Sequence, residues 1–192
     1  LGLAAEDARA VGALDSGEAS EAAVTFGYTA GNVAAASRGT RTCAFTAGAG
    51  PARSPALGSA TLEVGRGAVF WKATVHELNA NGALGLGVLG AARPASGVSF
   101  VDPTSFGWGS NGGVVTGGAH AYGSQGWQGF AAGDVAVFKL EAHQLSMRVR
   151  RLGDATFTVP TGGTPDLRAH VYMCGHPTRV ELSREVAAHE RY

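Results

Sequence analysis

The feature that most restricts the fold of this chain is how often glycine interrupts it. Thirty of the 192 residues are glycine and seven are proline. Both residues are unfavourable inside helices, so little room is left for a long one. From Ala22 onward, short runs rich in Val, Phe, Thr, Trp and Tyr recur between Gly, Asn, Pro and Ser. This recurrence is typical of an all-β protein with many short strands.

Several of these runs alternate as strands with one buried face do. In Val69–Glu77, Trp71 and Val75 would share one face, whereas Lys72 and His76 would lie on the other. The sequence therefore predicts an all-β domain built from many short strands. The runs that predict strands are Ala22–Tyr28, Val33–Ser37, Arg41–Thr46, Ala60–Val64, Val69–Glu77, Ala83–Leu89, Val98–Val101, Ser105–Trp108, Gly113–Thr116, Ala119–Tyr122, Val135–Glu141, Gln144–Arg150, Thr156–Val159, Arg168–Met173 and Arg179–Leu182.

The two ends of the chain differ from this pattern. Residues 1–21 are small, polar or acidic and are expected to form a tail or a marginal helix. Residues 22–183 are expected to form the β-strand domain, and residues 184–192 a short C-terminal helix or tail. The predicted helix covers Ser183–His189, because Ser183 could cap its first turn.

Charge and cysteine content restrict the partners and the compartment. The chain has 15 basic and 15 acidic residues, so it lacks the basic excess of a typical nucleic-acid-binding protein. It has no apolar run long enough to cross a bilayer, and its first residues do not resemble a signal peptide. Two distant cysteines, Cys43 and Cys174, suit a reducing compartment. We therefore expect an intracellular, cytoplasmic and monomeric domain that binds no nucleic acid and inserts into no membrane.

Two glycine-rich segments match the phosphate-binding pattern G-x-G-x-x-G. They span Gly85–Gly90 and Gly107–Gly112. A dinucleotide site needs this turn to open a helix, and neither segment is followed by a helical pattern. We expect no cofactor.

The residues that could carry catalysis or bind a metal are scattered. His170, Cys174 and His176 have part of a zinc-ligand spacing, but a second ligand pair is missing. Neither Cys43 nor any serine lies in a nucleophile motif. We therefore expect no metal site and no enzyme activity, although folding could still bring two carboxylates together.

An ordered set of motifs covers about residues 22–183. It begins with the aromatic-led Phe70–Val75 and continues with Leu86-Gly87-Val88, then Gly107-Trp108. The most specific element follows, Phe130-x-x-Gly133-Asp134-Val135, and the late apolar strand Leu167–Tyr172 completes the order. In this order the chain resembles the SPRY family, the core of B30.2 domains. It departs from the family pattern at Lys72, where the family often has Glu.

This resemblance implies that residues 22–183 form a bent two-layer antiparallel β-sandwich, which presents loops from one end to a partner protein. Loops on a rigid scaffold often carry function, and aromatic side chains in them commonly supply much of the binding energy. The candidate partner-binding residues are therefore the loop residues Arg93, Asp102, Trp108, Asn111, Tyr122, Gln125, Trp127 and Gln128.

The two loop tryptophans leave alternatives open. Trp108 fits the core and the surface equally well. Trp127 lies between Gly126 and Gln128 and is interpreted as an exposed anchor, with a lid over the sandwich edge as the alternative. An exposed Trp127 could also stack on a sugar, so a lectin-like carbohydrate-binding sandwich is the alternative to a protein-interaction module.

Overall fold

The computed structural model describes residues 67–93, 99–174, 177–184 and 186–192 in full. Before residue 67 it describes the backbone of four strands, β1 (Thr25–Thr29), β2 (Val33–Arg38), β3 (Thr42–Ala47) and β4 (Ser54–Ser59). The predicted tail 1–21 and the predicted strand Ala60–Val64 lie outside the described residues.

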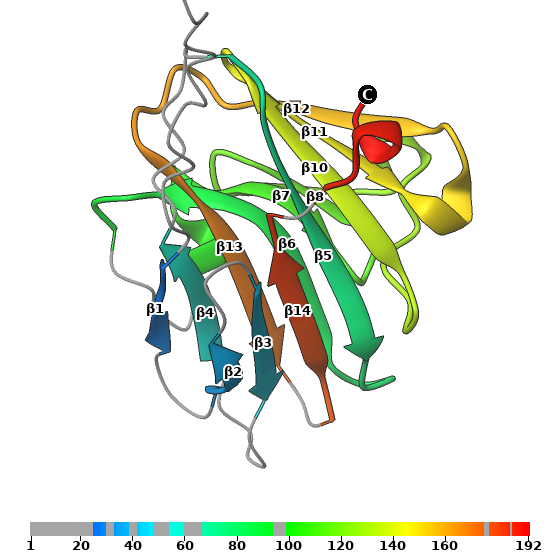
Figure 1. The fold of residues 1–192 in the computed structure, drawn as a ribbon. Coiled ribbons are helices and arrows are strands. Elements are labelled where there is room, and N and C mark those ends of the chain that lie inside the picture. The colour runs from blue at the N-terminus through cyan, green and yellow to red at the C-terminus, as the bar shows by residue number, and fades with distance from the viewer. Residues whose placement is uncertain are drawn as a thin grey trace, which may run out of the picture.

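Two seven-stranded antiparallel sheets stack face to face, as Figure 1 shows. Sheet A has the order β1-β4-β13-β6-β7-β8-β9, and sheet B has the order β12-β11-β10-β5-β14-β3-β2. The predicted β-sandwich is confirmed. The remaining strands are β5 (Val69–Glu77), β6 (Ala83–Gly90), β7 (Phe106–Gly109), β8 (Gly113–Thr116), β9 (Ala119–Tyr122), β10 (Val135–Glu141), β11 (Gln144–Val149), β12 (Thr156–Pro160), β13 (Leu167–Cys174) and β14 (Arg179–Ser183).

The core lies between the sheets and is filled by the alternating apolar residues of both. On β5 the predicted inward residues Trp71 and Val75 are buried, and the Trp71 ring stacks on Phe138 of β10 with centroids 5.2 Å apart. From sheet A, Leu86 and Trp108 reach the same core. Burying each such side chain stabilises the fold by about 1.5–3 kcal/mol. Turning a strand over would expose all of its apolar residues, so the alternation determines which face of each strand lies inward.

The most specific sequence motif forms a buried ionic turn before β10. The Asp134 carboxylate is 2% exposed and accepts hydrogen bonds from the Ala131 N–H (2.8 Å) and from Arg151 (Nε 2.8 Å, Nη2 3.0 Å). Arg151 Nη2 also donates to the Gly129 carbonyl (3.2 Å). Asp134 thus accepts from the backbone of its own turn, and its ion pair with Arg151 joins this turn to the short 3-10 helix Arg150–Leu152.

Two predicted elements are wrong. Part of the expected strand Val98–Val101 is a 3-10 turn, Ser99–Val101, because Phe100 folds onto the surface of sheet A instead of pairing along a sheet edge. The expected helix Ser183–His189 is also absent. Ser183 ends β14, and a single 3-10 turn, Ala188–Glu190, follows.

The C-terminal segment instead docks on the outer face of sheet B (Figure 1). Glu190 pairs with Arg150 (2.9 Å) and Lys72 (3.7 Å) and accepts a hydrogen bond from the Ala187 N–H (3.1 Å). Burial alone would raise the pKa of Glu190, but this hydrogen bond and the two cations together hold it below the usual range. The Tyr192 hydroxyl donates to the Val137 carbonyl (3.2 Å), and the Arg148 guanidinium lies 4.4 Å from the centre of the tyrosine ring. Tertiary contacts with a basic sheet face thus replace the helix that local sequence favours.

Candidate binding site on the outer face of sheet A

Where β6 and β7 pair, glycines occupy the positions on the outer face of sheet A. A Cβ atom on Gly87 would overlap the backbone of Phe106, and one on Gly85 would lie 2.5 Å from the ring of Phe100. The glycines therefore allow two close approaches, one between the strands and one between the sheet and the segment that crosses it.

That segment is the connection from β6 to β7, and Phe100 anchors it. The Phe100 ring lies over Gly85, with its centroid 4.9 Å from the His170 ring and 5.8 Å from the Tyr172 ring. Ser99 Oγ lies 2.9 Å from His170 Nε2, and His120 Nε2 lies 3.2 Å from the Phe100 carbonyl. The connection is thus bound to β13 on one side and to β9 on the other.

Beyond Phe100, Asp102 forms several side-chain contacts within the same connection. Asp102 accepts hydrogen bonds from the Thr104 N–H (2.8 Å) and hydroxyl (2.6 Å), and it pairs with Arg93 at 3.6 Å. These interactions together keep the pKa of Asp102 below its usual value although burial opposes them.

His170 lies fully enclosed beneath this connection. Burial lowers its pKa to about 3, although the nearby Asp102 acts in the opposite direction, so the imidazole is neutral at neutral pH. Its Nδ1 atom is buried and has no hydrogen-bond partner among the described residues. We call the described part of this connection, residues 99–105, the latch. The latch therefore packs on an uncharged histidine.

Beside the latch lies an open cavity of about 400 Å³, within the size range of small-ligand and side-chain pockets. Its wall contains the rings of Phe100, His120, Tyr122 and Tyr172 and the side-chain amides of Asn81 and Asn111. Among the described residues that line it, none is Asp, Glu, Lys or Arg. Such a cavity suits an uncharged group that can both stack and accept or donate hydrogen bonds.

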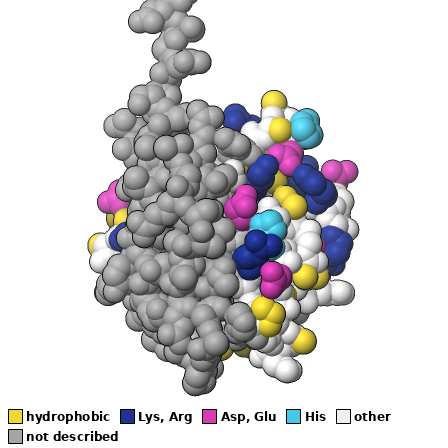
Figure 2. All heavy atoms as spheres, turned by 60° about the horizontal axis from the view of Figure 1, so that its bottom comes forward, with side chains coloured by type: hydrophobic (Ala, Val, Ile, Leu, Met, Phe, Trp, Pro, Cys, Tyr) yellow, Lys and Arg dark blue, Asp and Glu magenta, His cyan; other side chains and the backbone are white. Residues whose placement is uncertain are grey.

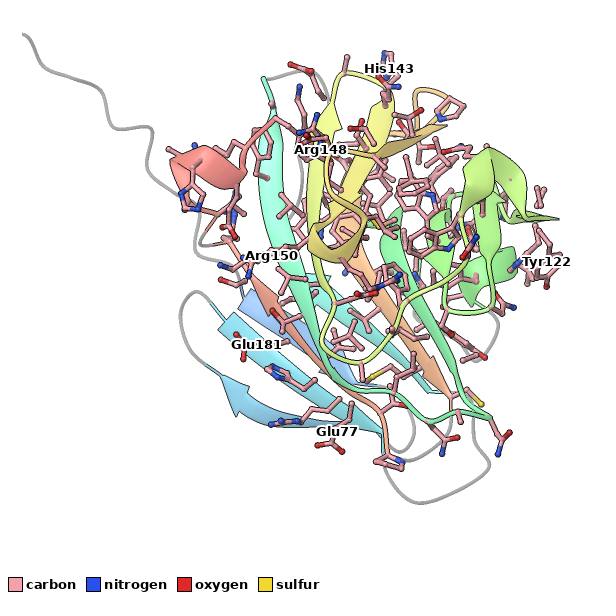
Figure 3. All side chains as sticks on the ribbon, turned by 90° about the vertical axis from the view of Figure 1, so that its right-hand side faces the viewer. Glu77, Tyr122, His143, Arg148, Arg150 and Glu181 are labelled. Carbon is pink, nitrogen blue, oxygen red and sulfur yellow. The ribbon has the colours of Figure 1, made fainter. Side chains whose placement is uncertain are left out.

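Tyr122 is an exposed aromatic side chain at this cavity. It is 66% exposed and projects from β9 at the rim of sheet A, where Figure 3 shows it extending away from the sandwich. Its ring lies 6.3 Å from that of His120, two residues earlier on the same face. Large exposed aromatic side chains are common anchors at protein interfaces.

The structure divides the eight predicted binding residues among three places. Asn111 and Tyr122 line the cavity, and Arg93 and Asp102 belong to the connection that borders it. Gln125 and Gln128 line a different hollow, of about 440 Å³, next to Arg151. The other two, Trp108 and Trp127, are buried at 0% and 1% exposure.

The expected exposure of Trp127 is wrong. Its ring packs edge-on against Phe130 and Phe157, and its indole N–H donates to the Gly109 carbonyl at 2.8 Å. The neighbouring Gly126 and Gln128 suggested a surface loop. The local turn nevertheless directs the ring inward, where its apolar area is removed from water and its polar atom is satisfied.

Sequence analysis missed most of the residues that line the cavity, including Asn81 and three residues that contribute rings. Phe100 lay in a predicted strand, and His120 and Tyr172 occupied outward positions of ordinary strands. The alternation could have placed His120 beside Tyr122 on one face of β9. Only the fold, however, brings β13 and the Phe100 turn to the same cavity.

Gln125 has a structural contact at the edge of sheet B. Its side-chain amide donates to the Thr158 carbonyl (2.6 Å) and accepts from the Thr158 N–H (3.0 Å). The amide thus pairs with the edge strand β12 as a neighbouring strand would.

The two glycine patterns are not phosphate loops. Gly85–Gly90 lies within β6, and Gly107–Gly112 forms β7 and the turn after it. Within the described residues, no three His, Cys, Asp or Glu side chains gather as metal ligands would, and no helix is long and apolar enough to span a membrane. His176 of the partial zinc spacing lies outside the described residues.

Charged side chains are concentrated elsewhere. Figure 2 shows basic and acidic side chains interspersed on the side of the molecule that it presents. On sheet B, Glu181 pairs with His76 and Glu77 pairs with Arg179, each at 3.4 Å. The uncharged cavity of sheet A therefore contrasts with a mixed-charge surface.

Solved structures with a similar fold include several SPRY domains. The SPRY domain of human HERC1 has a TM-score of 0.59 and 17% identity, over 75% of this chain and 89% of that one. A second human SPRY domain has a TM-score of 0.60 and 13% identity, over 84% and 99%. The PSpry domain of TRIM65 has a TM-score of 0.55 and 13% identity, over 84% and 91%. No protein-family model and no curated protein matches the sequence. The chain therefore has the SPRY fold.

Proposed function

We propose that this SPRY-fold domain is a protein-interaction module that binds an uncharged segment of a partner protein at the cavity on the outer face of sheet A. SPRY folds commonly mediate protein interactions. The observation that carries the proposal is the exposed Tyr122 beside a cavity whose described lining residues supply rings and amides and include no Asp, Glu, Lys or Arg. In this role the domain would act as an adaptor or scaffold within a larger protein.

The chemistry of the cavity supports a peptide as the ligand. The rings can enclose an apolar side chain, and the amides of Asn81 and Asn111 can bond to peptide groups. Truncating an anchor such as Tyr122 typically weakens binding by 2 kcal/mol or more at an interface hot spot, about thirtyfold in affinity. Arg93 and Asp102 pair with each other in the connection that supplies Phe100 and Val101 to the cavity wall, and neither is among the described residues that line the cavity.

The carbohydrate-binding alternative depended on an exposed Trp127. Burial of that ring removes the residue on which a sugar would have stacked. A glycan array still separates the two functions, because selective sugar binding would contradict the proposal.

We further propose the organisation expected from the sequence. Residues 22–183 would form the binding unit, with residues 1–21 as a tail, and the unit would act as a monomer in a reducing, cytoplasmic environment without a cofactor, metal, nucleic acid or membrane. Size-exclusion chromatography with light scattering checks the monomer, and limited proteolysis checks the boundaries.

The test is a comparison of variants in an affinity pull-down read by mass spectrometry. Tyr122→Ala should lose the proteins that the wild type captures, and His143→Ala, on the exposed turn between β10 and β11, should retain them. Equal capture by Tyr122→Ala and wild type would contradict the proposed site.

A further inference from the structure

The hydrogen-bond pattern of β9 leaves one side of that strand open. The Gly123 N–H donates to the Gly112 carbonyl (3.1 Å), which extends the register that pairs Tyr122 with Gly113. Bonded and non-bonded pairs alternate in an antiparallel ladder, so Tyr122 and His120 belong to non-bonded pairs. Their backbone N–H and C=O groups therefore point away from β8, toward the free edge of sheet A. No described strand pairs with β9 on that side.

The corresponding edge of sheet B is closed. On β12 the Gln125 amide occupies both backbone groups of Thr158, and Pro160 has no N–H to offer. Proteins commonly protect sheet edges with such contacts, with prolines or with charged side chains. In the part of the chain that the structure describes, β9 has none of these devices, and all four of its residues are exposed.

The open edge also lacks charge. Between Asp102 and Asp134 the sequence contains no Asp, Glu, Lys or Arg, and this stretch includes β7, β8 and β9. A charged peptide would therefore find no side chain of opposite charge on β9. An uncharged peptide would leave no charged side chain of β9 buried without a partner.

We infer that the partner segment binds as an additional antiparallel or parallel strand on β9, and that it is an extended, uncharged peptide of another protein. This inference rests on the proposed function. The added strand would lie about 4.8 Å beyond β9. It would exchange backbone hydrogen bonds with His120 and Tyr122.

The same geometry links the edge to the cavity. The side chains of His120 and Tyr122 line the cavity, while their backbone groups face the free edge. In an added strand every second side chain would lie on the outer face of sheet A, beside these two rings. Backbone pairing would supply affinity, and the cavity would select an apolar or aromatic side chain at one of these positions.

The probe is a displayed library of short random peptides selected on the whole chain. Selected peptides should be uncharged and should share an apolar or aromatic residue with an alternating pattern around it. Binding of one synthetic peptide is then measured by calorimetry, and amide hydrogen exchange is followed by NMR with and without it. The amides of His120 and Tyr122 should exchange at least about tenfold more slowly in the complex.

Two variants at one position separate backbone pairing from side-chain contact. His120→Ala removes only the imidazole, whereas His120→Pro also removes the outward N–H, a change that an edge strand tolerates. His120→Pro should bind at least about tenfold more weakly than His120→Ala. Methylating alternate amide nitrogens of the peptide tests the same pairing without altering the protein. Methylation at the pairing positions should abolish binding, and methylation at the intervening positions should not.

The outcomes distinguish this inference from the proposed function. If Tyr122→Ala abolishes binding but the two His120 variants bind equally and the amides gain no protection, strand addition is wrong and the proposed site stands. If Tyr122→Ala binds as the wild type does, or no peptide is selected, both are wrong. Selection of charged peptides overturns the inference. So does protection of the His120 and Tyr122 amides in a dimer of the free protein, because the occupant would then be a second copy.

Discussion

Trp127 provides the sharpest test of how the described loops are packed. Its neighbours in sequence are typical of a surface turn, but the side chain is only 1% exposed. The centroid of its ring lies 4.7 Å from that of Phe130 and 5.1 Å from that of Phe157. Trp127→Ala should therefore destabilise the whole domain rather than remove an interface anchor.

The magnitude follows from two losses. Replacing a buried tryptophan by alanine costs about 3–5 kcal/mol, because transfer energy is lost and a cavity remains. The Gly109 carbonyl, which accepts the indole N–H at 2.8 Å, would also lose its partner, at a cost of about 1 kcal/mol. For a chain of this size each kcal/mol lowers Tm by about 2–4 °C, so a fall of at least about 8 °C is expected.

The assay is urea unfolding followed by tryptophan fluorescence and circular dichroism, with thermal melts in parallel. Tyr122→Ala is the matched control, since this exposed ring should change the unfolding free energy by no more than about 0.5 kcal/mol. A Trp127→Ala protein that unfolds at the wild-type urea concentration would refute the buried placement of this ring.

Three further perturbations test the site and its support. Burial lowers the pKa of His170 from 6.5 to about 3, so between these pH values the unfolded chain binds a proton that the folded domain does not. The free energy of unfolding is therefore not reduced by this residue above pH 6.5, and it decreases as the pH falls toward 3. Urea unfolding between pH 6.5 and 5 should show a slope of up to about 1.4 kcal/mol per pH unit, which His170→Asn removes. Asp134→Asn should lower the unfolding free energy by about 1.5–3 kcal/mol through loss of the Arg151 pair; an unchanged urea midpoint would contradict this. Gly85→Ala should displace Phe100 at a cost of about 1–3 kcal/mol and weaken partner binding, and wild-type stability and affinity together would count against the latch.

Much of the fold could be predicted because single strands carry their own signal. Val69–Glu77 alternates clearly between a core face and a solvent face, and its predicted bounds match β5. The Gly-Asp turn before Val135 was recognisable because a short acidic side chain after glycine commonly bonds to nearby backbone N–H groups. Both are local properties of a few neighbouring residues.

Errors arose where distant contacts override local preference. Phe100 leaves its predicted strand because Gly85 and His170, distant in the sequence, create a surface that receives its ring. The C-terminal segment gives up its helix to reach Lys72 and Arg150 through Glu190. These contacts depend on strand order, which no local pattern encodes.

The candidate site was predicted only in part for the same reason. Asn111 and Tyr122 were selected as loop residues and do meet at the cavity. Gln125 was selected for the same chemistry, but its amide is committed to Thr158. Composition identifies residues able to bind a partner, whereas the fold determines which of them are still available.

The most direct test of the account is a site-specific photo-crosslink to the natural partner. A benzophenone side chain placed at position 122, on the uncharged rim of sheet A, is compared with one at position 143, and Figure 3 shows the two positions well separated. After irradiation in a lysate of the source cells, a partner protein should be attached at position 122 and not at position 143. Attachment at position 143 alone, or equally at both, would contradict the proposal that partners bind at this edge of the sandwich.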